Sequence, residues 1–217
     1  MLLNVVQSRL RVVSTEQTTA WGDAEGRRRD ILSSAELILE QQGYAGLTMR
    51  AIALGAGVSS GTVYQYFSGK EDVFAALMER RLDELQRTLA KVDRSLGIAG
   101  VLREIEPQVT ELWRRFGRSA AQWEAKVLSG GRRGKEIAGS AQDYRKTIKA
   151  LAKALNETAE ACGQALIDDP ALPHWVWDSL IGLADDLLLQ GARTNRVKPA
   201  QLIAFATGAI ERGVIAR

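Results

Sequence analysis

Hydrophobic residues recur at helical spacing along most of this chain, and no segment shows the strict alternation of a half-buried β-strand. Glycine and proline residues divide the pattern, because each of them ends or interrupts a helix. The pattern predicts helices over these segments: 26–42, two short helices between 47 and 67, then 70–91, 101–116, 118–128, 135–166, 173–190 and 199–212. The chain is therefore expected to be all-α.

The segment from residue 47 to residue 67 predicts two short helices joined by a tight turn. Thr48 can cap the first helix, and Ser59 and Ser60 can cap the second, because a side-chain hydroxyl satisfies N–H groups that the first helical turn leaves unpaired. Gly57 lies where the chain must reverse, and glycine tolerates the positive φ that such a turn requires. Ser68 is expected to cap the long helix that follows. This order of elements is typical of a helix-turn-helix unit.

The second short helix of this unit has one apolar face. Val63 and Phe67 are four residues apart and are expected to point inward. The outward face then carries small or hydrogen-bonding residues: Ser60, Gly61, Tyr64 and Gln65. A short helix with such an outward face suits the major groove of DNA.

The same region resembles the tetracycline-repressor (TetR) family over roughly residues 27–75. Several of the family's elements occur in the right order and spacing: Leu47-Thr48, Ala53, Gly57-Val58, Gly61-Thr62-Val63-Tyr64, Tyr66-Phe67 and Lys70-Glu71-Asp72. The resemblance implies an N-terminal arm over 1–25, a three-helix DNA-binding domain over 26–72, and a helical effector-binding and dimerisation domain over 73–217. It also implies a homodimer that binds a palindromic operator in double-stranded DNA, mostly as a repressor, and a small-molecule effector that releases it.

Side-chain chemistry indicates which residues could read bases, and the resemblance implies which contact phosphate. We expect Arg50 to read guanine, Gln65 to read adenine, and Tyr66 and Lys70 to contact phosphate. The full set of expected DNA-binding residues is Arg27, Thr48, Arg50, Ser59, Ser60, Gly61, Thr62, Tyr64, Gln65, Tyr66 and Lys70. Two alternatives stay open: Arg50 is a solvated surface residue, or Tyr66 packs against the first helix.

Charge alone does not identify a DNA-binding domain here. The chain carries a formal net charge of +3. Residues 26–72 contain five basic side chains (Arg27, Arg28, Arg29, Arg50 and Lys70) and five acidic ones (Asp30, Glu36, Glu40, Glu71 and Asp72). Any electrostatic contribution must therefore come from placement, with the three arginines at the entry to the first helix and Lys70 just after the second motif helix.

The second domain contains aromatic residues on segments that would surround a cavity in a TetR-like fold. The candidate ligand-binding residues are Trp113, Phe116, Trp123, Tyr144 and Trp177. Ligand pockets in helical bundles are mostly apolar, so the expected effector is mostly apolar as well. The alternative is an ordinary packed core, which would make the chain a DNA-binding interaction protein without a small-molecule effector.

The last two expected helices are rich in small and aliphatic residues. In the family, these helices of two subunits form a four-helix dimer interface. The candidate interface residues are Leu180, Ala184, Leu187, Leu188, Leu202, Phe205 and Ala206. The alternative is packing within one chain.

Other classes of protein find little support in the sequence. One His and one Cys leave no catalytic pair, and no phosphate-binding loop or metal-ligand cluster is evident, so we expect no enzyme, metal or cofactor. No apolar run is long enough to span a bilayer, and the first residues do not form a convincing signal peptide. The single Cys162 fits a reducing cytoplasm and is expected to be a small core residue.

Overall fold

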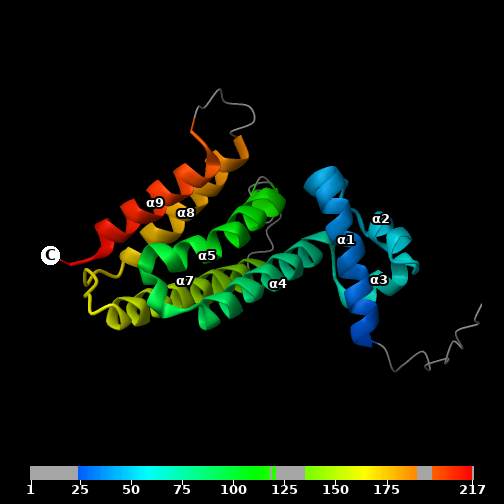
Figure 1. The fold of residues 1–217 in the computed structure, drawn as a ribbon. Coiled ribbons are helices and arrows are strands. Elements are labelled where there is room, and N and C mark those ends of the chain that lie inside the picture. Colours follow the sequence, from blue (N-terminus) through cyan, green and yellow to red (C-terminus); the bar gives the residue numbers. More distant parts are fainter. Residues whose placement is uncertain (1–23, 118, 121–134, 190–196, 217) are drawn as a thin grey trace, which may run out of the picture.

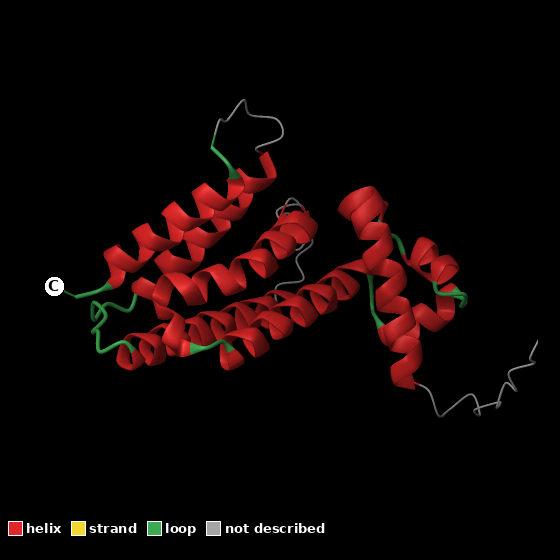
Figure 2. Cartoon of the chain, viewed as in Figure 1, coloured by secondary structure: helices red, strands yellow, loops and turns green. Residues whose placement is uncertain are grey.

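The computed structural model describes residues 24–117, 119–120, 135–189 and 197–216. Helices make up nearly all of the regular structure in these ranges, and the one β element among them is an isolated bridge between Leu166 and Ile215 (Figure 2). The expected all-α class is confirmed. No helix among the described residues is long and apolar enough to cross a membrane.

The helices form a small N-terminal group and a larger C-terminal group, joined by one long helix (Figure 1). The N-terminal group contains α1 Ala24–Gly46, α2 Met49–Gly55 and α3 Ser60–Tyr66. The connecting helix is α4 Lys70–Lys91. The C-terminal elements are η1 Arg94–Leu96, α5 Gly97–Leu112, the π-helical η2 Trp113–Gly117, α7 Lys135–Ala161, α8 Leu172–Leu189 and α9 Pro199–Val214. In the picture, α4 runs beside α7, while α8 and α9 lie beyond α5.

Several expected helix boundaries differ from the structure. The N-cap of α4 is Gly69, which has no side-chain cap, so the prediction for Ser68 is wrong: its backbone N–H and its hydroxyl both donate to the carboxylate of Asp72. Helix α5 begins at Gly97 and not at residue 101, and Pro107 lies inside it without ending it. Cys162 is exposed just beyond α7, so its expected place in the core is also wrong.

Two hydrophobic cores hold the described structure together. The N-terminal core gathers buried residues of α1, α2, α3 and the first turns of α4, including Ile31, Val63 and Phe74. The C-terminal core gathers buried residues of α4, α5, α7, α8 and α9. Phe116 of η2 belongs to the N-terminal core, and Leu112 packs against both cores. The end of α5 therefore joins the two groups of helices.

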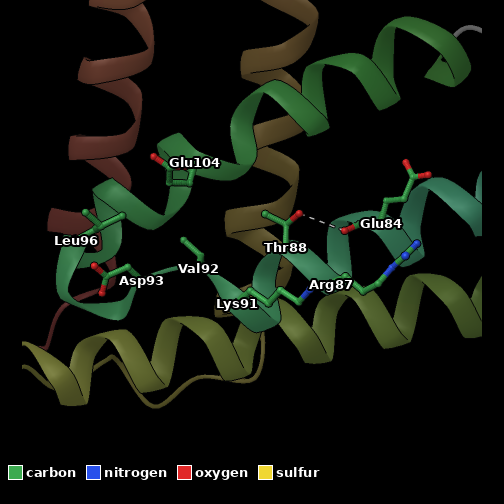
Figure 3. Close-up of a pocket in the computed structure, with 8 residues that line it drawn as sticks. All are labelled: Glu84, Arg87, Thr88, Lys91, Val92, Asp93, Leu96 and Glu104. Carbon is green, nitrogen blue, oxygen red and sulfur yellow. Dashed lines mark hydrogen bonds between the residues drawn. The ribbon is translucent and has the colours of Figure 1, made fainter.

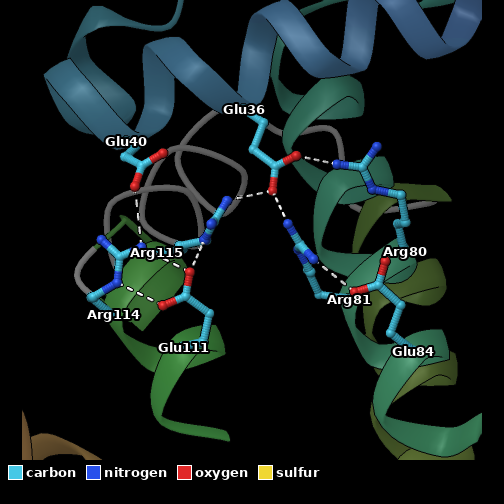
Figure 4. Close-up of polar contacts among 8 residues, drawn as sticks. All are labelled: Glu36, Glu40, Arg80, Arg81, Glu84, Glu111, Arg114 and Arg115. Atoms are coloured by element: carbon cyan, nitrogen blue, oxygen red, sulfur yellow. Dashed lines mark hydrogen bonds and ion pairs between the residues drawn. The ribbon is translucent and has the colours of Figure 1, made fainter. Parts of the chain in front are cut away.

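Ion pairs strengthen this junction (Figure 4). The Glu36 carboxylate on α1 pairs with Arg80 and Arg81 of α4, and lies 2.6 Å from Nη1 of Arg115 on η2. Arg114 joins Glu40 of α1 at 3.2 Å. Both Arg80 and Arg81 are largely covered where the two groups of helices meet.

Candidate nucleic-acid interface

Local hydrogen bonds define the two helices of the motif. The Thr48 hydroxyl accepts a bond of 3.1 Å from the backbone N–H of Ala51, and the Ser59 hydroxyl accepts one of 3.0 Å from that of Thr62. These two bonds are N-caps of α2 and α3, each of which satisfies an N–H group that the helix cannot. Gly57 has φ +65° in the turn between them, as expected of the residue that reverses the chain.

Helix α3 shows the face that its sequence predicts. Val63 is fully buried and Phe67, its C-cap, is 5% exposed. Tyr64 on the opposite side is 57% exposed, and Gly61 and Gln65 are exposed as well. Docking of α2 on α1 supports this orientation, since the buried Ser34 hydroxyl donates to the Ile52 carbonyl at 3.0 Å. The exposed face of α3 is therefore free to enter a groove of suitable width.

The other expected DNA-binding residues lie around this face. Arg27, Thr48, Arg50 and Ser59 are exposed, whereas Ser60 and Thr62 are half-buried. The hydroxyls of Ser59 and Thr62 also bond each other at 2.9 Å, so both take part in the cap. Tyr66 is half-buried against the N-terminal core, which agrees with the packing alternative and leaves part of its surface accessible.

Interdomain ion pairs change the charge balance of this domain. Glu36 and Glu40, two of its acidic residues, are neutralised by arginines of α4 and η2. None of its five basic side chains makes an ion pair within the described part of the chain: Arg27, Arg28, Arg29, Arg50 and Lys70. The domain's positive charges are therefore available to an anionic partner, although its sequence is balanced.

Two of these cations lie over aromatic rings. The Lys70 ammonium is 4.2 Å from the centroid of the Tyr44 ring, and the Arg28 guanidinium is 5.3 Å from that of Phe67. Sequence reasoning named Arg28 only as one of three arginines at the entry to the first helix, and it did not name Tyr44. No spacing rule joins Tyr44 to Lys70, because the two residues are brought together only by packing of α1 against α4.

Comparison with known proteins agrees with this geometry. The family model described as "Bacterial regulatory proteins, tetR family" matches residues 31–77. The HTH-type transcriptional regulator HbdR of Aromatoleum sp. (strain CIB) is 31% identical over 105 residues, which cover 48% of this chain and 44% of HbdR. The HTH-type transcriptional repressor AcnR of Corynebacterium diphtheriae is 33% identical over 79 residues, which cover 36% of this chain and 40% of AcnR. The matches to both relatives thus span less than half of their length.

The similarity in fold extends over most of the chain. The crystal structure of a transcriptional regulator from Rhodococcus sp. Rha1 aligns with a TM-score of 0.63 at 21% identity, and covers 86% of this chain and 97% of that one. The chain carries the helix-turn-helix domain of the TetR family. Its helix-turn-helix unit is the part that the family model matches, and its C-terminal helices share the architecture of the Rhodococcus protein.

The expected ligand-binding residues do not meet around one described cavity. Phe116 is 2% exposed in the N-terminal core, and Trp177 is 7% exposed in the C-terminal core. Trp113 donates from its indole N–H to Asp185 of α8 at 3.0 Å. Tyr144 is exposed and its hydroxyl lies 3.0 Å from Nδ1 of His174. Trp123 lies outside the described residues.

Two cavities in the described structure are lined by other residues. The first, of about 480 Å³, opens where the end of α4 meets η1 and α5 (Figure 3). Most of the residues that line it are polar or charged, and they carry both signs of charge: Glu84, Arg87, Thr88, Lys91, Val92, Asp93, Leu96 and Glu104. The second, of about 420 Å³, lies between α7 and the segment that leads into α8. Neither cavity is lined by the aromatic residues that were expected. No described group of three or more His, Cys, Asp or Glu residues could hold a metal ion.

The expected dimer residues divide into three sets by their burial. Leu180 and Ala184 are each 1% exposed and belong to the C-terminal core, so both are already covered within one protomer. Phe205 is 70% exposed and Leu188 is 39% exposed. The other three, Leu187, Leu202 and Ala206, are half-buried. Only the second set leaves an apolar surface on α8 and α9.

Proposed function

We propose that this TetR-family chain is a transcriptional regulator that binds a palindromic operator as a homodimer and most often represses the gene it controls. The exposed face of α3, with Gly61, Tyr64 and Gln65 pointing away from the core, is the observation that carries the proposal. Side chains of this kind hydrogen-bond base edges in the major groove, and glycine allows close approach of the backbone. Such a regulator works on chromosomal DNA in the cytoplasm.

The position of each side chain decides whether we assign it to base reading or to phosphate. Arg50 and Gln65 are exposed on α2 and α3 and are assigned to base reading. Thr48, Tyr66 and Lys70 are assigned to phosphate, where they set the register of the domain on the duplex. The unpaired basic side chains of the domain support this assignment, because binding to phosphate then needs no ion pair to break.

Dimerisation supplies a second α3 helix, which would bind the second half-site of the operator. Phe205 and Leu188 give α8 and α9 an exposed apolar surface, which a second copy of these helices would cover. Two α3 helices must lie about 34 Å apart to enter successive major grooves on one side of the duplex. A change in the angle between the two protomers would therefore release both half-sites.

Repression agrees with the name of the similar protein AcnR, an HTH-type transcriptional repressor. A small, mostly apolar effector is proposed as the signal that releases the operator. It would bind the C-terminal domain and favour a different separation of the two α3 helices.

A second candidate function is favoured by one observation. Phe116 and Trp177 are buried in two different packed cores, so the expected ligand-binding residues do not line one described cavity. A DNA-binding protein with a packed C-terminal domain, controlled by a partner protein or by its own abundance, is consistent with that packing.

Selection of bound duplexes from a random-sequence library tests the main proposal, and it does not require that the operator sequence be known. The expected result is enrichment of an inverted repeat with half-sites about one helical turn apart. Enrichment of single half-sites would contradict the dimer, and failure to enrich any sequence would contradict operator binding.

Titration of planar apolar compounds into the protein–operator complex separates the two candidates. With an effector site, the same compound quenches tryptophan fluorescence and weakens operator binding, because the two equilibria are linked. Native mass spectrometry of the purified protein provides an independent measurement of any co-purified small molecule. If no compound weakens operator binding and no small molecule co-purifies with the protein, the second candidate is favoured.

A further inference from the structure

The Lys70 side chain is held in place before any DNA is bound. Its ammonium lies 4.2 Å from the Tyr44 ring centroid and donates to the Tyr44 carbonyl oxygen at 3.3 Å. Neither contact neutralises the charge, because an aromatic face and a neutral carbonyl attract a cation without cancelling it. An ammonium has three donors, so the remaining ones are available to a phosphate oxygen.

Tyr44 is itself firmly placed. Its residue is 5% exposed, and its ring packs edge-to-face against Phe74 of α4 with the centroids 5.1 Å apart. The hydroxyl donates to Glu71 at 3.4 Å. Gly43, with φ +65°, kinks α1 immediately before Tyr44 and turns the chain toward α4. The ring is therefore a fixed surface against which a flexible lysine is ordered.

Arg28 makes the same kind of contact with a second aromatic ring. Its guanidinium lies 5.3 Å from the ring centroid of Phe67, a residue that is 5% exposed and caps the C-terminus of α3. Arg28 is exposed on the first turns of α1 and makes no ion pair with a described residue. The two aromatic residues, Phe67 and Tyr44, come from the domain core, whereas Arg28 is exposed and Lys70 is half-buried.

We infer that Tyr44 and Phe67 are positioning residues that hold Lys70 and Arg28 as preset contacts for DNA phosphate, and that Arg28 is a phosphate contact of this domain. This inference rests on the proposed DNA-binding function. A free lysine or arginine loses much side-chain entropy when it binds, and a side chain ordered beforehand loses less. Cation–π contact supplies this order and leaves the charge free, whereas an ion pair would cancel it.

Fluorinated phenylalanines test the role of the rings without disturbing the core. The parent variants are Tyr44→Phe and wild-type Phe67, and each ring is then replaced by phenylalanine with increasing numbers of fluorine atoms. Fluorine withdraws electron density from the ring face and weakens cation–π attraction, while the size and burial of the ring change little. The probe is a synthetic duplex of arbitrary sequence, and the measurement is the affinity over a series of salt concentrations.

The expected result is a stepwise loss of affinity of about two- to fivefold at each ring, in line with the usual strength of an exposed cation–π contact. The loss at position 44 should vanish in a Lys70→Gln background, and the loss at position 67 should vanish in an Arg28→Gln background. Arg28→Gln and Lys70→Gln should each lower the salt slope by about one counterion. Lys149→Gln, an exposed change on α7, is the matched control and should leave the slope unchanged.

Other outcomes overturn the inference. Tighter binding on fluorination means that the ring draws the cation away from DNA. An equal loss in the Lys70→Gln and Arg28→Gln backgrounds means that the rings act only through the stability of the fold. If fluorination leaves the affinity unchanged while the wild-type protein binds the duplex, Tyr44 and Phe67 are not positioning residues. A wild-type protein that binds no duplex at any salt concentration contradicts the proposed function instead.

Discussion

Phe116, near the end of η2, packs edge-to-face against Phe74 of α4, with the two ring centroids 5.6 Å apart. Both rings are buried in the core that also supports α2 and α3. One residue earlier, Arg115 pairs with Glu36 of α1. The C-terminal part of the chain therefore completes the core of the DNA-binding domain, and the two are mechanically joined through η2.

Replacing Phe116 by Ala should destabilise the DNA-binding domain. Loss of a buried phenylalanine leaves a cavity, and such changes lower the free energy of unfolding by about 3–5 kcal/mol. Denaturant unfolding measures the effect, and hydrogen exchange should show faster exchange in α1. Leu37→Ala is the control, because Leu37 is 57% exposed, and it should change the free energy of unfolding by less than about 0.5 kcal/mol. Similar losses for the two variants would show that Phe116 does not complete this core.

The Glu111 ion pairs predict a loss of stability in acid. A hydrogen bond from Arg114 is the main cause that lowers the pKa of Glu111 from 4.5 to about 2; burial opposes it, and Arg115 adds to it. Because the pKa is depressed in the folded state, this contribution is present above pH 4.5 and is lost as the pH falls toward about 2. Glu111→Gln should therefore flatten the fall in unfolding free energy over that range. Glu104→Gln is the control, since Glu104 is exposed and forms no described ion pair; an unchanged pH profile for Glu111→Gln would contradict the assignment.

A charge on the exposed surface of α8 and α9 should prevent dimerisation. Phe205→Glu places a carboxylate at the centre of the proposed apolar contact, where desolvation without a partner is costly. The expected product is a monomer with much weaker operator binding, because a single half-site supplies too little affinity. Sedimentation measures the mass, and Leu96→Glu at another exposed apolar position is the control. A wild-type monomer that binds the operator tightly would refute the dimer.

Arg50 and Lys70 should respond differently to substitution. Arg50→Ala is expected to cost about 1–3 kcal/mol at one base pair and to relax the preference there. Lys70→Ala should weaken binding alike on all sequences and reduce the salt slope by about one. Binding isotherms over single-base variants of the selected operator, repeated at several salt concentrations, distinguish the two effects. If Arg50→Ala weakens every variant equally, Arg50 is only another phosphate contact.

The sequence by itself determined the elements whose causes are local. The caps by Thr48 and Ser59 and the turn at Gly57 were predicted correctly, because each depends on residues within a few positions. The bounds of α4 match the predicted segment, since a regular apolar stripe of 3.6-residue period defines them. The inward face of α3 follows from the same spacing. Where several groups compete for one helix end, as at Ser68 and Asp72, local rules failed.

Only the tertiary structure decided what each face packs against. The sequence made Phe116 a candidate ligand-binding residue and gave no sign that its neighbour is Phe74 of α4, in the N-terminal core. Arg80 and Arg81 occupy polar positions of α4. An arginine at such a position can be solvated or can pair with a carboxylate such as that of Glu36, and the pattern does not distinguish the two. Tyr44 meets Lys70 because α1 and α4 cross, and no pattern along the chain encodes that crossing. Contacts between residues far apart in sequence depend on how the helices are arranged in space, so they could be read only from the fold.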